Sequence, residues 1–256
     1  MELDFAAGRL GAGRATFRRA LELFRELDDH WVISAVQYHQ GMALHRAGLF
    51  PEALEVYRSA LSEGRIGLTN TVQYALANLG HISLVIGDLD GAAAYFSSAH
   101  AVACELGAEA SVLALLGQGH LARLRDDPVE AARCYDAALS RMSASETPDW
   151  VATALIGLGQ LAHDQGDIDT ALRRQREALR RTTSGGQPTY PPAAAALEVL
   201  AAVAASRHLL RAAGRLLGTA AAWRQSSSWP ASPLELRNSE RVTTLLSDCA
   251  QAVITD

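Results

Sequence analysis

The residues of this chain that could carry chemistry are histidine, cysteine, arginine and the carboxylates, because lysine is absent. The chain therefore has no amine for a Schiff base and no lysine for a phosphate-binding loop. The cysteines, Cys104, Cys134 and Cys249, are far apart and lack CxxC spacing, so neither a disulfide framework nor a zinc site is indicated. We interpret them as small buried hydrophobic side chains, and the alternative is a reactive thiol.

No combination of nucleophile, base and orienting residue stands out along the chain. The serines at 226–228 lack a Gly-x-Ser-x-Gly context, and most carboxylates lie near expected helix ends, where capping explains them. His81 and His120 could suggest a metal, but no carboxylate or cysteine stands at ligand spacing. The sequence predicts no enzyme, no catalytic residue, no metal and no cofactor; the alternative is a small enzyme on a helical scaffold.

The composition is that of a folded protein without a strongly charged partner. Hydrophobic residues make up 49% of the 256 residues, and the net charge of −5 gives no bias toward nucleic acid or an anionic membrane. There is no apolar run of membrane-spanning length, and the first four residues include two acidic groups where a secretory signal is basic. We expect a cytoplasmic protein. All 23 basic residues are arginine, which is typical of a GC-rich bacterial genome such as that of an actinobacterium.

A repeat of about 40 residues organises the chain. Gly41, Gly80, Gly119 and Gly159 are 39, 39 and 40 residues apart. Each glycine is followed at fixed offsets by an alanine, an aromatic residue or glutamine, and a second alanine: Ala53, Tyr57, Ala60; Ala92, Phe96, Ala99; Ala131, Tyr135, Ala138; and Ala171, Gln175, Ala178. Small residues let two antiparallel helices approach closely, and the aromatic ring fills the groove between them. The pattern predicts an all-α fold of helix pairs.

Turn residues separate the helices of each pair, at 48–51, 87–88, 126–128 and 166–167. We expect a partial repeat in residues 1–33, where Gly13, Phe17 and Ala20 fit a second helix, and four repeats in 34–185. A degenerate fifth repeat and a C-terminal capping helix, from about Leu234 to Val253, would occupy 186–256, so that the whole chain forms one continuous solenoid domain.

These residues resemble the tetratricopeptide repeat, whose pattern is a small residue late in the first helix, then alanine, an aromatic and alanine along the second. The resemblance implies a right-handed solenoid of antiparallel helix pairs that serves as a binding scaffold. This chain departs from the family in its longer period and in lacking the usual tryptophan, since Gln37, Leu76, Leu115 and Leu155 stand there.

The segment 210–220, with Trp223-Arg224, a proline loop and Glu240-Arg241, is similar to the closing unit of large actinobacterial regulators. These are the large LuxR-type and the SARP (AfsR-like) regulators, in which the repeats accompany nucleotide-binding and DNA-binding modules. The chain itself has no GxxxxGK[ST] loop and no recognisable helix-turn-helix, so the resemblance implies the sensor or partner-binding part alone.

The resemblance also implies that the first helix of each pair lines a concave groove. Residues with a common phase relative to the repeat glycines would then bind a partner or ligand: Tyr38, Met42, His45, His81, His120, Arg123, Gln160 and His163. Their imidazoles predict binding that varies near about pH 6 to 7. The alternative is that these side chains are simply solvated.

The dense basic cluster of the chain consists of Arg173, Arg174, Arg176, Arg180 and Arg181. It could bind phosphate, or it could be a solvated helix face in which arginines complement the helix dipole. We favour the second interpretation and expect no direct contact with nucleic acid.

The sequence thus predicts a non-catalytic protein-interaction or effector-sensing domain of a bacterial transcriptional regulator. The alternative is a stand-alone adaptor or assembly scaffold. The expected partner is a protein or peptide segment, or a small effector, without a membrane partner, and homo-oligomers are possible.

Overall fold

The computed structural model describes residues 10–66, 70–108, 111–142, 148–183, 190–227, 236–237, 239–244 and 246–247. Every regular element in this part of the chain is an α-helix, as predicted. The helices are α2 (Leu10–Glu26), α3 (His30–Arg46), α4 (Phe50–Ile66), α5 (Thr71–Ile86), α6 (Leu89–Glu105), α7 (Val112–Leu124), α8 (Pro128–Arg141), α9 (Pro148–Asp164), α10 (Ile168–Thr183), α11 (Tyr190–Ser206) and α12 (Leu210–Ser227).

Helices begin and end where the turn residues predict. The carboxylates of Asp88 and Asp127 accept hydrogen bonds from the backbone N–H three residues on, which caps α6 and α8. Gly87 and Gly166 close α5 and α9 in the left-handed conformation, with φ of 85° and 82°. Asp126 takes the same conformation after α7, with φ of 56°, although it is not glycine.

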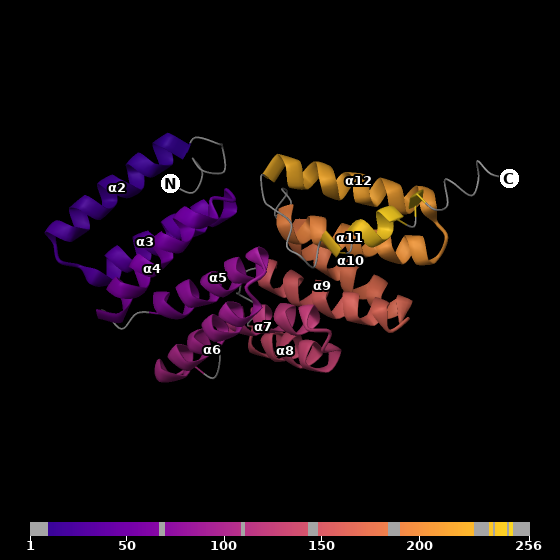
Figure 1. Cartoon of the computed structure of the whole chain (residues 1–256), viewed down its shortest axis with the longest axis horizontal. Coiled ribbons are helices and arrows are strands. Elements are labelled where there is room, and N and C mark those ends of the chain that lie inside the picture. Colours follow the sequence, from indigo (N-terminus) through magenta and orange to yellow (C-terminus); the bar gives the residue numbers. More distant parts are fainter. Residues whose placement is uncertain are drawn as a thin grey trace. The chain divides into compact units, whose positions relative to one another are not determined.

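Neighbouring helices pack in pairs: α3 with α4, α5 with α6, α9 with α10, and α11 with α12 (Figure 1). The helix α2 packs on α3. The chain divides into two compact units, residues 1–118 and 119–256, hereafter the first and second units. No helix in the described part of the chain has both the length and the apolarity needed to cross a membrane.

The repeat glycines and aromatic residues meet as the pattern predicts. A Cβ atom added to Gly119 would lie 2.5 Å from Cε1 of Tyr135, and one on Gly157 would lie 2.4 Å from Cε2 of the same ring. Tyr135 is therefore held along both edges by glycine backbone, and its side chain is fully buried. Gly41 meets Tyr57 and Gly80 meets Phe96 in the same way within the first unit.

The fourth repeat fills the aromatic position with glutamine. Gln175 is fully buried beside Gly159, and its Nε2 donates a hydrogen bond to the backbone oxygen of Ile156 at 3.1 Å. In the fifth pair, a buried ion pair joins α11 to α12: Arg224 donates two hydrogen bonds to Glu198, at 2.7 and 2.9 Å. The Gln175 hydrogen bond thus takes the place of ring packing in the fourth repeat, and the ion pair is a separate contact of the fifth pair.

The described residues between 236 and 247 are helical and lie within the second unit. Val242 is buried against Ala201, Ala204 and Ala205 of α11 and Ala213 of α12. This segment, hereafter the C-terminal helix, therefore covers the last helix pair.

Candidate functional site

In the second and third repeats, the residue that follows the repeat glycine packs on the aromatic ring of its own repeat. The ring centroid of His81 lies 5.3 Å from that of Phe96, and His120 lies 5.8 Å from Tyr135, both edge to face. Met42 is partly buried against the core of the first unit. These side chains contribute to packing, whatever surface they also present.

In the first unit, Tyr38 lies among aromatic side chains. Its ring centroid is 6.0 Å from that of Tyr74 on α5 and 6.1 Å from that of Tyr57. His45 is buried against Phe50 and Tyr57. A partner at this face would therefore meet tyrosine rather than His45.

Burial sets the charge of two predicted site histidines. Desolvation, aided by the neighbouring His81, lowers the pKa of His45 to about 3, and desolvation lowers the pKa of His81 to about 4. Both imidazoles stay neutral around neutrality. The expectation of titration near pH 6 to 7 is wrong for these two residues, because their rings are inserted into the core rather than solvated.

In the second unit, the structure gathers three predicted site residues around Asp164, which ends α9. Gln160 donates a hydrogen bond from Nε2 to the Asp164 carboxylate at 2.9 Å, and Nδ1 of His163 lies 3.5 Å from it. Arg123 acts through its charge on both Asp164 and Tyr135, and His120 packs on the Tyr135 ring. We call Arg123, Gln160, His163, Asp164 and Tyr135 the Asp164 cluster.

The electrostatics of the cluster favour a charged carboxylate. Partial burial raises the pKa of Asp164, but the close approach of Nδ1 of His163, the hydrogen bond from Gln160 and the charge of Arg123 outweigh it, so the pKa lies below its ordinary value. Burial raises the pKa of Tyr135 to about 12, against the opposing charge of Arg123. At neutral pH the cluster presents the Asp164 carboxylate beside the Arg123 guanidinium.

The Asp164 carboxylate is the part of the cluster that an incoming group can reach, because its side chain is 42% exposed. The Oε1 atom of Gln160 has no hydrogen-bond donor among the described residues, but it is inaccessible, so it is a buried unsatisfied acceptor and not a contact for a ligand. The arrangement suits a ligand that donates hydrogen bonds to a carboxylate, and it contains no nucleophile paired with a base.

Two residues of this site were not predicted from the sequence: Asp164 and its further partner Arg241, whose NH1 lies 3.5 Å from the carboxylate. Asp164 directly follows His163, a predicted site residue. It would have been included if the predicted groove positions had been continued one residue further along the helix. No pattern along the chain connects Arg241 to this repeat, because their contact depends on where the C-terminal helix packs.

The five arginines of the basic cluster lie along α10. Glu177 accepts hydrogen bonds from Arg180 at 2.7 Å and from Arg181 at 2.9 Å, and Arg173 donates to Thr170. Arg176 is exposed and Arg174 is half-buried. Glu177 therefore offsets part of the charge, and the contacts fit a solvated helix face.

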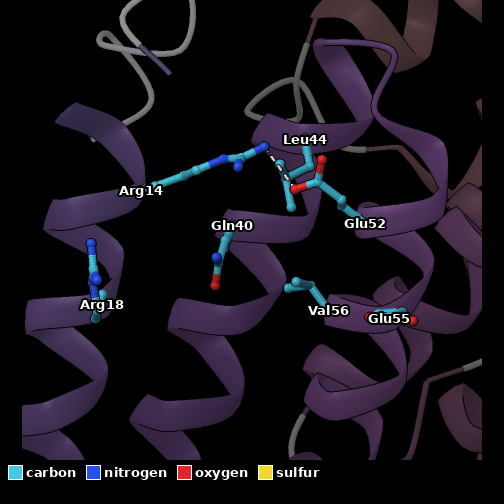
Figure 2. Close-up of a pocket in the computed structure, with 7 residues that line it drawn as sticks. All are labelled: Arg14, Arg18, Gln40, Leu44, Glu52, Glu55 and Val56. Carbon is cyan, nitrogen blue, oxygen red and sulfur yellow. Dashed lines mark hydrogen bonds and ion pairs between the residues drawn. The ribbon is translucent and has the colours of Figure 1, made fainter. Parts of the chain in front are cut away.

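A cleft of about 430 Å³ opens between α2, α3 and α4 in the first unit, as Figure 2 shows. Arg14 bridges it by an ion pair with Glu52 at 2.7 Å, and Gln40, Leu44 and Val56 line its floor. The remaining lining residues are Arg18 and Glu55. Two arginines and two glutamates leave this cleft without net charge, so it offers no clear selectivity for a charged ligand.

The cysteines differ from one another. Cys134 is buried as predicted, and burial raises the pKa of its thiol to about 12, which makes it a poor nucleophile. Cys104 is exposed on α6, so its interpretation as buried is wrong, and Cys249 lies outside the described residues. Within the described part of the chain, no three metal-ligating side chains come together.

The comparisons with known proteins address the fold. A tetratricopeptide repeat family model matches residues 111–184. The crystal structure of BtubC (BKLC) from P. vanneervenii is similar with a TM-score of 0.59 and 20% identity, over 85% of this chain and 91% of that one. No curated protein matches the sequence. The chain is thus a tetratricopeptide-like assembly of helix pairs, an architecture used for protein interaction.

Proposed function

We propose that this chain is the non-catalytic protein-interaction or effector-sensing part of a bacterial transcriptional regulator, and that it binds a polypeptide segment at the Asp164 cluster. The observation that carries the binding site is the exposed carboxylate of Asp164, which accepts a hydrogen bond from Nε2 of Gln160 and is stabilised by the charge of Arg123.

A polypeptide matches this site because its side chains supply both cations and hydrogen-bond acceptors, also where the segment is helical. A carboxylate or amide oxygen of such a side chain receives a hydrogen bond from Arg123. Asp164 stays charged at neutral pH and attracts a cationic side chain. The interaction is therefore selective for charge.

The binding test compares three full-length chains as bait in extracts of the source organism. Arg123→Ala with Asp164→Asn should reduce capture of a specific partner at least about tenfold, as expected when charged hydrogen bonds are lost. Arg176→Ala on the exposed face of α10 is the matched control and should leave capture unchanged. Loss of capture in the control alone would move the binding surface to the basic cluster.

The regulatory context rests on the resemblance of segment 210–224 to the closing unit of large bacterial regulators. Mapping of the transcript and its reading frame tests this context. A nucleotide-binding or DNA-binding module in the same frame would support it. A short, separate reading frame would favour the stand-alone adaptor instead, and the binding proposal would be unaffected.

A further inference from the structure

The C-terminal helix presents two faces to the second unit. Its apolar face carries Val242, which is 1% exposed, and Leu246, which packs in the same cluster on α11 and α12. The other face carries Arg237 and Arg241, which are four residues apart and therefore project from the same side of the helix. Aliphatic packing thus holds one face of the helix against α11 and α12, and the other face carries two cationic side chains.

The two arginines meet carboxylates at the ends of first helices. NH1 of Arg237 lies 3.7 Å from Asp126 after α7, and NH1 of Arg241 lies 3.5 Å from Asp164 at the end of α9. The C-terminal end of a helix also carries a partial negative charge, so each arginine faces a carboxylate and a helix end of the same sign. This edge of the second unit, from Asp126 to Asp164 and on to the alanines of α11, is hereafter the acidic edge.

Asp126 stands where three other repeats have glycine. Gly48, Gly87 and Gly166 close α3, α5 and α9 with positive φ, and Asp126 has the same conformation after α7, as His208 does after α11. The left-handed conformation costs more for aspartate than for glycine. The carboxylate is therefore present at a backbone position that does not favour it, and its contact in the described chain is with Arg237.

The ion pairs alone are too weak to hold the helix firmly. The four side chains are between 42% and 86% exposed, and exposed pairs of this kind contribute about 0.2 to 1 kcal/mol each. Val242 and Leu246 supply the buried area. Such an arrangement positions a helix by charge and lets a competing segment replace it.

We infer that the C-terminal helix is an internal ligand of the acidic edge, and that the external partner is an amphipathic helix with the same pattern, two cationic residues four apart beside an aliphatic residue. This inference rests on the proposed function, since Asp164 belongs to both sites. Binding of the partner displaces the C-terminal helix, so the chain regulates access to its own site.

The test uses a fluorescent peptide with the sequence of residues 234–253, in which serine replaces Cys249. Its binding to the full-length chain is measured by anisotropy. Val242→Glu should release the internal helix and tighten peptide binding at least about tenfold, because the competing occupant is removed. Arg237→Glu with Arg241→Glu alters only exposed side chains, and should tighten binding about threefold to tenfold even if Val242→Glu impairs folding.

A charge exchange then identifies the surface. In the chain carrying Val242→Glu, Asp126→Arg with Asp164→Arg should weaken the peptide at least about tenfold. A peptide with glutamate at both arginine positions should restore binding to that variant. Arg211→Glu with Arg215→Glu, two exposed arginines four apart on α12, is the matched control and should change nothing.

Equal affinity of the peptide for the unaltered chain and the released chains would overturn the inference. So would failure of the peptide to bind a released chain whose circular dichroism is unchanged. The proposed function is tested separately, by capture of a partner with the Arg123 and Asp164 variants, so either idea can fail alone.

Discussion

The packing of Tyr135 between two glycines leads to a sharp prediction for Gly119→Ala. The new methyl group would lie 2.5 Å from Cε1 and 2.8 Å from Cδ1 of the ring. The ring cannot retreat, because a Cβ at Gly157 would already be 2.4 Å from its other edge. Overpacking of a filled core costs about 1 to 3 kcal/mol, and this site belongs near the upper end. The higher helix propensity of alanine offsets about 1 kcal/mol of this loss in the free energy of unfolding.

The net effect on the free energy of unfolding should be a loss of about 2 kcal/mol, which lowers Tm by about 4 to 8 °C in a protein of this size. The matched control is Gly218→Ala on α12, where no atom lies within 4 Å of the added Cβ. There the propensity alone acts, and Tm should rise by about 1 to 4 °C.

A double-mutant cycle isolates the contact. Tyr135→Leu removes the ring edge that meets Gly119, so Gly119→Ala should cost less in that background, with a coupling energy of about 0.5 to 3 kcal/mol. Differential scanning calorimetry provides the values. If Gly119→Ala raised Tm as Gly218→Ala does, the assignment of the repeat glycines to close helix contacts would be refuted.

Three further changes test the packing and its charges. Ala92→Leu, at a fully buried helix contact, should lower the free energy of unfolding by about 1 to 3 kcal/mol. Arg176→Ala, on an exposed helix face, should change it by less than about 0.5 kcal/mol. Equal Tm values for the two variants would refute the repeat register. His45 and His81 are neutral in the folded chain but become protonated in the unfolded chain near pH 6.5. The free energy of unfolding should therefore fall by up to about 1.4 kcal/mol per pH unit for each histidine as the pH drops from 6.5 toward 4. Replacement of both histidines by glutamine should flatten a plot of Tm against pH over that range. Glu198→Ala leaves the Arg224 guanidinium in a buried site without its carboxylate, so urea denaturation should show that the free energy of unfolding falls by about 3 to 5 kcal/mol. A fall of less than about 1 kcal/mol would show that water reaches the ion pair.

The sequence was sufficient to predict the helix pairs because one residue pattern serves both local and tertiary packing. Gly80, Ala92 and Phe96 each stand at a helix crossing, so their periodic spacing reports the fold directly. The core position of Phe17 follows from the same pattern, since this residue of α2 is fully buried in the first unit.

The candidate site was less predictable. A common phase places residues on one helix face, but it does not say how far each side chain sinks between neighbouring helices. His45 and Gln160 share that phase and are buried, whereas Asp164, one position beyond His163, is exposed. The contact of Arg241 with Asp164 joins residues that are far apart in the chain, so no local pattern could indicate it.

The account depends most on the claim that a polypeptide binds at the Asp164 cluster. Photo-crosslinking in living cells of the source organism tests it directly, with a benzophenone amino acid at position 123 and, as control, at position 176. We predict a crosslink from position 123 to one specific protein, lost when Asp164→Arg is added, and none from position 176. A specific crosslink from position 176 alone, or one from position 123 that is insensitive to Asp164→Arg, would contradict the account.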